Sequence, residues 1–178
     1  MTHEGQTREP NAGVHPAALS QDRLLSQCEV RFTRRSGPGG QNRNKVETAA
    51  ILTHRETGLS AEANETRSQA GNRAVALFRL RLKLALEVRG TDDSTRPSAL
   101  WRSRLRGGRI VVNPEHEDFP AMLAEALDAL HRAADEPSAA AEPLGCSASQ
   151  LVKLLKAEPR AFAALNDRRK ARGLHPLI

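Results

Sequence analysis

Apolar and polar residues alternate in the first third of the chain, which is the pattern of strands with one buried face. Glu29–Thr33 alternates in this way, and the runs ETAAILTH and LSAEAN flank the tetrapeptide RETG at residues 55–58. Two short extended runs around a glycine-containing turn predict a β-hairpin. We therefore expect a small antiparallel or mixed sheet in this part of the chain.

Residues 66–89 are rich in Leu, Ala and Arg, and two periods compete over them. Apolar and basic residues alternate from Phe78 to Leu86, which is a strand period. Leu, Arg, Lys and Ala are nevertheless helix formers, and few β-branched residues interrupt them. A helical stripe is also present at Leu77, Leu80, Leu84 and Val88. The stretch therefore predicts a long helix on which the sheet packs.

The rest of the chain is predicted to form linkers and helices. Ser20 is placed to cap a short helix, and Pro120 lies in the first turn of an acidic helix. Ser147 and Gln150 predict a capping box, and Pro159 opens the last helix. The predicted units are a flexible N-terminus (1–19), a folded domain (20–89), a linker with a short strand and the acidic helix (90–134), a linker (135–146) and a basic helical segment (147–178). The fold class is α+β, followed by an α-helical C-terminal extension.

The charge balance points to polyanionic partners. The chain has 178 residues, with 27 Lys and Arg against 21 Asp and Glu, a formal net charge of +6. An excess of this sign favours nucleic acid or an acidic membrane surface. Acidic residues concentrate between 115 and 142, so we expect the acidic helix to face away from RNA.

Other classes of site find no support in the sequence. Cys28 and Cys146 form no CxxC pair, so we expect neither a zinc site nor a disulfide framework. No apolar run reaches the length of a membrane span, and the N-terminus lacks the apolar core of a signal peptide. We therefore expect a cytoplasmic, monomeric protein without a metal, a cofactor or a membrane contact.

The segment Gly37-Pro38-Gly39-Gly40-Gln41 holds the candidate chemistry. Gly39 and Gly40 can adopt φ angles closed to other residues and let the backbone approach a ligand closely. Gln41 does not titrate near neutrality, so it is no general base. It can instead offer its backbone N–H to an oxyanion and its side-chain amide to position water. The flanking cations Arg34, Arg35, Arg43 and Lys45 are placed to hold phosphates.

The string SGPGGQNRNK, followed by LTH, TG and RSQxxN, resembles the catalytic domain of class-I peptide chain release factors and related ribosome-rescue hydrolases. The resemblance covers residues 20–89, which are thus the candidate GGQ catalytic domain. It implies that the loop enters the peptidyl transferase centre of the large ribosomal subunit, where Gln41 helps water attack the ester of peptidyl-tRNA. It also implies N5-methylation of Gln41 by a glutamine methyltransferase, and ribosomal RNA as a partner.

The candidate site residues fall into three groups. The catalytic group is Gly39, Gly40 and Gln41. Loop support is implied for Ser36, Pro38, His54, Ser68 and Gln69, with Asn72 in the same helix-start motif. RNA binding is expected for Arg34, Arg35, Arg43, Asn44, Lys45, Arg67, Arg73, Lys153, Lys156, Arg168, Arg169 and Lys170.

Two departures from the family separate the possible functions. Asn42-Arg43 stands where the family commonly has His-Val, and no tripeptide that reads a stop codon is recognisable. The leading hypothesis is therefore codon-independent hydrolysis of peptidyl-tRNA on the ribosome. The alternative is a non-catalytic ribosome- or RNA-binding protein that keeps the scaffold. Hydrolysis of free peptidyl-tRNA is disfavoured, because no His, Asp or Glu adjoins Gln41.

Overall fold

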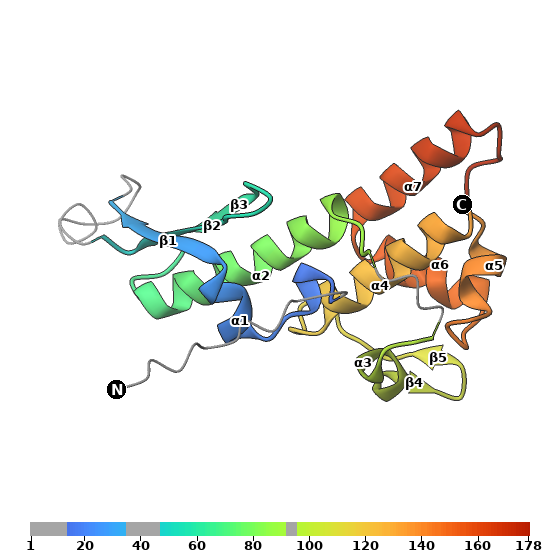
Figure 1. The fold of residues 1–178 in the computed structure, drawn as a ribbon, viewed down its shortest axis with the longest axis horizontal. Helices are drawn as coiled ribbons and strands as arrows, with labels where there is room; N and C mark the ends of the chain where they lie inside the picture. Colours follow the sequence, from blue (N-terminus) through green and yellow to red (C-terminus); the bar gives the residue numbers. More distant parts are fainter. Residues whose placement is uncertain (1–13, 35–46, 92–95) are drawn as a thin grey trace, which may run out of the picture.

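The structure is a computed structural model that describes residues 14–34, 47–91 and 96–178 (Figure 1). A small sheet and a long helix lie at one end of the described molecule, and a group of helices lies at the other. The predicted α+β fold class with a helical C-terminal extension is confirmed.

Within the described residues, three strands form an antiparallel sheet in the order β1-β2-β3. The strands are β1 (Cys28–Thr33), β2 (Ala49–His54) and β3 (Ser60–Ala63), and a short helix α1 (Gln21–Ser26) precedes them. The predicted hairpin is confirmed, because β2 and β3 pair directly across the turn at residues 55–59. Gly58 in that turn has a φ of +71°, which residues other than glycine rarely adopt.

The long helix α2 (Gln69–Glu87) packs on β2 and β3. Leu77, Leu80 and Leu84 of the predicted stripe are buried, so the helical period prevails over the strand period. The facing strands contribute mainly small side chains, with Ala50, Ala61 and Ala63 buried. Small side chains let the helix axis approach the sheet closely and leave the leucines to fill the core.

The stretch ahead of α1 is part of the fold. A flexible N-terminus was predicted over 1–19, and of these the described residues 14–19 include a 3₁₀ helix, Pro16–Ala18, with Ala17 and Leu19 buried. The guanidinium of Arg81 on α2 donates to the carbonyls of Ala17 (3.0 Å), Leu19 (3.1 Å) and Glu117 (3.1 Å). One side chain therefore joins three segments that are distant in sequence.

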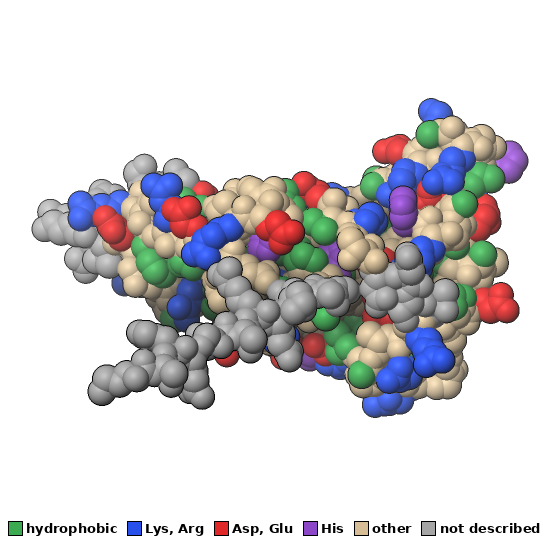
Figure 2. Space-filling view, viewed as in Figure 1, with side chains coloured by type: hydrophobic (Ala, Val, Ile, Leu, Met, Phe, Trp, Pro, Cys, Tyr) green, Lys and Arg blue, Asp and Glu red, His purple; other side chains and the backbone are tan. Residues whose placement is uncertain are grey.

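Beyond α2 the chain forms a short helix α3 (Ala99–Ser103) and a hairpin of β4 (Leu105–Arg106) and β5 (Arg109–Ile110). Gly107 and Gly108 make its turn, with φ angles of +56° and +76°. Two successive positive φ angles are the requirement of a type I′ turn, which explains the Gly-Gly pair. Lys and Arg side chains gather over this hairpin in Figure 2.

The acidic helix α4 (Phe119–Arg132) is a core helix. Most of its residues are buried, and it packs on α2 and on the 3₁₀ helix. Its apolar residues surround the axis instead of forming one stripe, so it is not a solvated surface helix, and its orientation away from RNA stays a prediction. Its acidic residues Glu125 and Asp128 are half-buried and buried, respectively, and both bind other parts of the chain.

Three more helices complete the described fold: α5 (Pro137–Ala141), α6 (Ala148–Lys156) and α7 (Pro159–Ala171). Ser147 caps α6 as predicted, through the N–H of Gln150. The reciprocal half of the predicted capping box is absent among the described contacts, because the Gln150 side chain accepts the N–H of Ile110 instead. The predicted linker 135–146 contains α5, and its buried Leu144 accepts a hydrogen bond from the Trp101 indole at 2.9 Å.

A buried ion cluster attaches α7 to the turn after α4. The Asp135 side chain is 0 % exposed, and its two oxygens meet Arg168 Nε at 2.9 Å and Arg172 Nε at 3.2 Å. Asp135 has a φ of +64°, in the left-handed region that Asp and Asn tolerate better than most residues. A carboxylate at this position therefore binds two helix residues from a turn whose geometry few other side chains accept.

We expect Asp135→Asn to lower the free energy of unfolding by about 2 kcal/mol, while Asp167→Asn, at an exposed site on α7, changes it by less than about 0.5 kcal/mol. Asn keeps the shape and the tolerated φ but removes the charge that opposes Arg168 and Arg172. The cost stays below that of a fully buried pair because both arginines are partly exposed. Urea unfolding measures both variants, and equal stability of Asp135→Asn and wild type would show that the cluster contributes nothing.

Candidate active site

The candidate catalytic segment begins and ends at one end of the sheet. Gly39, Gly40 and Gln41 lie outside the described residues, as do Arg35, Ser36, Pro38, Arg43, Asn44 and Lys45. The described chain stops at Arg34, directly after β1, and resumes at Glu47, directly before β2. Thr33 pairs with Ala49 across the two strands, so both ends of the segment start from adjacent positions. In Figure 1 this is the end of the sheet away from α5, α6 and α7.

Asn72 fixes the base of this segment to α2. Its buried side-chain amide donates to the carbonyls of Thr48 (2.7 Å) and Thr66 (2.9 Å). Its carbonyl oxygen accepts from the backbone N–H of Thr66 (2.9 Å) and from the Thr66 hydroxyl (3.0 Å). One carboxamide thus uses all of its donors and acceptors to join the entry to β2, the loop after β3 and the first turn of α2.

The first turn of α2 adds a second tie to the same base. Gln69 Nε2 donates to the carbonyl of Glu47 at 2.6 Å, and the Ser68 hydroxyl caps the helix by accepting the N–H of Gly71 at 3.1 Å. A Cβ on Gly71 would lie 3.2 Å from Thr66 Oγ1, so a larger residue would press on the group that Asn72 binds. The Gln69 and Asn72 contacts are the geometry that loop support requires, although support of catalysis itself stays a proposal.

Basic side chains surround this base. Arg34 lies 3.5 Å from Glu47 in an exposed ion pair, which contributes little to stability. Arg67 and Arg73, at the start of α2, are exposed, and no ion pair is described for either of them. These three cations share the end of the molecule where the segment emerges, so they are available to phosphates there.

His54 lies at the opposite end of the β1–β2 ladder, which corrects its assignment to loop support. It pairs with Cys28, five positions from the Thr33–Ala49 pair, or about 17 Å along the strand. Its ring is buried, with Nε2 donating to Gln27 Oε1 (3.2 Å) and Nδ1 accepting from Thr57 Oγ1 (3.0 Å). His54 therefore ties β1 to the hairpin turn and has no contact with the loop base.

The comparison with known families decides what this arrangement is. The model of the RF-1 domain matches residues 24–107, a range that runs from α1 through the β4–β5 turn and includes the whole candidate segment. Over residues 24–107 the chain is therefore similar to the RF-1 domain of peptide chain release factors.

Curated relatives agree with this assignment. A stretch of 67 residues is 49% identical to peptide chain release factor PrfB1, chloroplastic, of Arabidopsis thaliana, covering 36% of this chain and 15% of the relative. Over 119 residues the chain is 35% identical to peptide chain release factor 2 of Acidothermus cellulolyticus, covering 61% of this chain and 31% of the relative. Over 87 residues it is 39% identical to peptide chain release factor 1 of Methylibium petroleiphilum, covering 46% and 24%. The chain thus spans less than a third of the length of these release factors.

The predicted C-terminal RNA-binding residues lie beyond the RF-1 domain and differ in exposure. Lys153, Lys156 and Lys170 are exposed. Arg168 is held by Asp135. The structure corrects the prediction for Arg169, which is only 7% exposed and donates to the carbonyls of Asp135 and His175 and to Glu136 Oε1. The guanidinium of Arg169 binds groups of the protein itself, so Arg169 is a structural residue.

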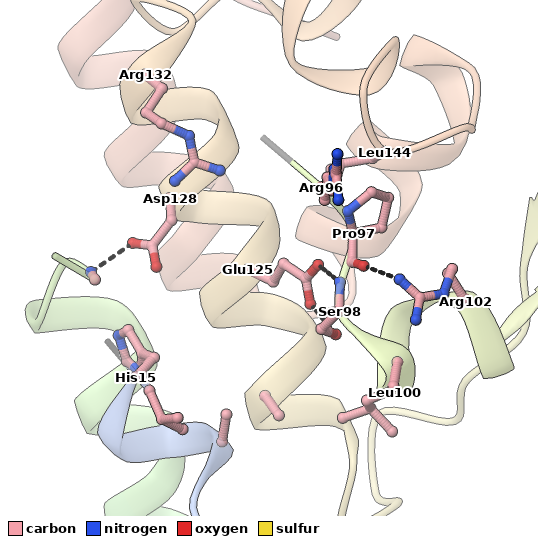
Figure 3. Close-up of a pocket in the computed structure, with 15 residues that line it drawn as sticks. His15, Arg96, Pro97, Ser98, Leu100, Arg102, Glu125, Asp128, Arg132 and Leu144 are labelled. Carbon is pink, nitrogen blue, oxygen red and sulfur yellow. Dashed lines mark hydrogen bonds between the residues drawn. The ribbon is translucent and has the colours of Figure 1, made fainter. Parts of the chain in front are cut away.

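A cavity of about 560 Å³ lies where the RF-1 domain meets α4 (Figure 3). Its carboxylates are already in use, because Asp128 accepts the N–H of Gly90 (3.0 Å) and Glu125 accepts both the N–H and the hydroxyl of Ser98 (2.8 and 2.6 Å). A Cβ on Gly90 would lie 2.6 Å from Asp128 Oδ2, so a larger residue there would have to displace the Asp128 carboxylate. The cavity walls therefore serve to fasten the chain after α2 to α4.

The RSQxxN motif identifies Gln69 and Asn72, but no sequence pattern identified Thr66. Its signal was weak, since a threonine two residues before a helix cap is common in any turn. Among the described residues, no three His, Cys, Asp or Glu side chains gather as a metal site would require. No helix in the described ranges is long and apolar enough to cross a membrane.

We expect Asn72→Ala to lower the free energy of unfolding by about 2–4 kcal/mol, because it leaves the Thr48 and Thr66 carbonyls and the Thr66 N–H without partners. Arg73→Ala, at the next and exposed position, serves as the control and should change stability by less than about 0.5 kcal/mol. Urea unfolding of both variants measures the difference. Similar stabilities would show that the Asn72 network is dispensable for the RF-1 domain.

Two histidines, His54 buried and His15 half-buried, give the fold a dependence on pH. Burial lowers the pKa of His54 and of His15 below the ordinary value of 6.5. His15 is half-buried, with Nδ1 accepting the Ala17 N–H and Nε2 donating to the Val88 carbonyl, so its neutral form also fits the site. In the window below pH 6.5 the unfolded chain binds more protons than the folded one at both positions, so folded stability falls as pH falls.

We therefore expect the free energy of unfolding to decrease as pH is lowered from about 7.5 through 6.5 towards 5, with a shallower decrease in His54→Gln than in wild type. His131→Gln, at an exposed position, should keep the wild-type slope. Urea midpoints across this range provide the measurement. A slope in His54→Gln as steep as that of wild type would mean that His54 does not contribute.

Proposed function

We propose that the chain hydrolyses the ester bond of peptidyl-tRNA in the peptidyl transferase centre of the ribosome. The observation that supports this is an intact Gly39-Gly40-Gln41 inside an RF-1 domain whose loop base is fixed by Gln69 and Asn72. A protein that only bound RNA would gain nothing from this tripeptide at this position.

The reaction requires little acid or base catalysis from the side chains of the protein. The oxygen of water bonds to the acyl carbon, the bond between that carbon and the ribose oxygen of the tRNA breaks, and the leaving oxygen takes up a proton of the water and becomes a hydroxyl. The backbone N–H of Gln41 donates to the oxyanion that forms on the way, and its carboxamide orients the water. Gly39 and Gly40 supply the backbone conformation that presents this N–H.

The base of the segment explains how a short loop can act with accuracy. A donor that stabilises a transition state must be held within a fraction of an ångström, which requires support from rigid elements. Thr48 and Glu47 are bound to the first turn of α2, so the return of the segment into β2 is fixed. The exposed Arg34, Arg67 and Arg73 are the candidates for contacts with ribosomal RNA or tRNA phosphates around that base.

The finer features of the proposal rest on the sequence alone. Codon-independent action on stalled ribosomes follows from the lack of a recognisable stop-codon tripeptide. N5-methylation of Gln41 by a glutamine methyltransferase follows from the family resemblance, and cytoplasmic location and a monomeric state stay predictions. The rival function is a non-catalytic ribosome-binding protein, which the release experiment below separates from the enzyme.

We expect Gln41→Ala to reduce peptide release from ribosome complexes about 100-fold or more, because alanine keeps the backbone N–H but lacks the carboxamide that orients the attacking water, with little change in ribosome binding. Gln21→Ala, at an exposed glutamine on α1, is the matched control and should release peptide at the wild-type rate. Single-turnover release with saturating protein measures the step directly. Equal release by Gln41→Ala and wild type would leave the non-catalytic alternative.

The same assay tests codon independence. Complexes with a stop codon, with a sense codon, and with an mRNA that ends at the decoding site are compared under identical conditions. Release from the truncated complex that matches or exceeds release at the stop codon is expected. Release confined to one stop codon would refute codon independence while keeping the hydrolysis.

A further inference from the structure

A basic groove lies between the β4–β5 hairpin and α6, and most of it is outside the RF-1 match. Its volume is about 700 Å³, within the range of ligand-binding clefts. Polar groups that line this β5–α6 groove include Arg104, Arg109, Asn113, His116, Gln150 and Lys153. Within the described part of the chain, no Asp or Glu lines it.

The β4–β5 hairpin places two arginines close together, which lowers its stability. Arg106 and Arg109 are opposite each other in the β4–β5 register, next to the Gly-Gly turn. Like charges directly opposite each other destabilise a hairpin. Among the described contacts neither arginine meets a carboxylate, and Arg106 donates only to the carbonyl of Leu105. An arrangement that weakens the folded state without internal compensation fits an external anion.

The cations of the groove are free to bind such an anion. In the described structure the side chains of Arg109 and Lys153 make neither an ion pair nor a hydrogen bond, and both residues are exposed. Lys156 follows Lys153 by three residues on α6 and extends the basic surface. Arg104 differs, because Asp118 already neutralises it. The available charge therefore comes from the hairpin tip and from one side of α6.

The walls of the groove are fixed by the protein itself. Gln150 on α6 accepts the N–H of Ile110 at 3.2 Å, and Arg104 accepts the N–H of Val111 through its carbonyl at 2.9 Å. The first bond joins α6 to β5 and the second joins the residue after β5 to the end of α3, and neither uses a free cation. Val111 is 53% exposed beside them, which places an apolar surface next to the positive charge.

We propose that the β5–α6 groove binds the phosphodiester backbone of RNA, with Arg109 and Lys153 on phosphates and Val111 against a sugar. The charge and the exposed valine point to a polyanion with apolar parts. The choice of RNA rests on the proposed ribosomal function, since RNA is the polyanion that surrounds such a protein. The site is separate from Gln41, so it adds an RNA contact that the RF-1 domain does not supply.

The experiment measures binding of the full chain to a labelled single-stranded RNA of about 12 nucleotides, a length that a single domain can cover. Arg109→Gln with Lys153→Gln is expected to weaken binding about tenfold at 0.1 M salt. The slope of log affinity against log salt should become shallower by about 1.4, because each neutralised phosphate contributes about 0.7 on single strands. The melting temperature should not fall, since the change relieves the Arg106–Arg109 repulsion.

Two matched variants separate the groove from net charge. Arg109→Lys with Lys153→Arg keeps both charges and should bind like wild type. Arg23→Gln with Arg55→Gln removes two exposed charges elsewhere and should bind within about twofold of wild type. Unchanged affinity in the groove variant, or equal loss in the distant variant, would overturn the proposal.

Competition identifies the anion. Unlabelled RNA should displace the probe, while inorganic phosphate and polyglutamate at matched ionic strength should not. Efficient displacement by phosphate would assign the groove to a small phosphate compound, and displacement by polyglutamate would assign it to an acidic protein, and either result overturns the RNA assignment. Gln41→Ala should bind the probe normally, so failure of the catalytic proposal and failure of the groove proposal are distinguishable.

Discussion

The carboxamide of Asn72 is the interaction on which the candidate active site depends. It is buried at the start of α2, and it binds three backbone groups and the Thr66 hydroxyl, ahead of β2 and after β3, through four hydrogen bonds. A buried amide with every group satisfied is stable, whereas a partly satisfied one is costly. The network therefore favours one position for Thr48, the residue from which β2 continues, and with it one exit direction for the segment that contains Gln41.

The RF-1 domain is joined to the C-terminal helices through a common core. Buried residues of the described ranges form one continuous cluster that runs from Ala17 through α2 and α4 to Leu165 on α7. Directly after α2, the hydrogen bond between Gly90 and Asp128 attaches the chain to α4. Arg81 on α2 binds the carbonyl of Ala17, ahead of α1. Because interiors are close-packed, a shift of α4 is resisted by α2. The β5–α6 groove and the strand ends Thr33 and Ala49 are consequently parts of one packed structure.

Local pattern predicted the elements well, and tertiary partners explain where it failed. The stripe of Leu77, Leu80 and Leu84 identified α2, because helical period and residue propensity agree there. The RSQxxN motif identified Gln69 and Asn72, but their acceptors are main-chain carbonyls that no residue type announces. Arg169 was misassigned because its partners, Asp135 and Glu136, are more than thirty positions away and became neighbours only through folding. His54 was misassigned because a motif gives order along a strand and not the end of the ladder at which a residue lies.

The three hydrogen bonds of Arg81 bear on where the chain can be truncated at its N-terminal side. A boundary at residue 20, where sequence similarity to release factors begins, would remove two carbonyls that the guanidinium holds and would uncover the hydrophobic surface beneath Ala17 and Leu19. Recombinant versions that begin no later than His15 keep the hydrogen bonds between Arg81 and these two carbonyls. Residues ahead of the matched domain are therefore part of its folded structure.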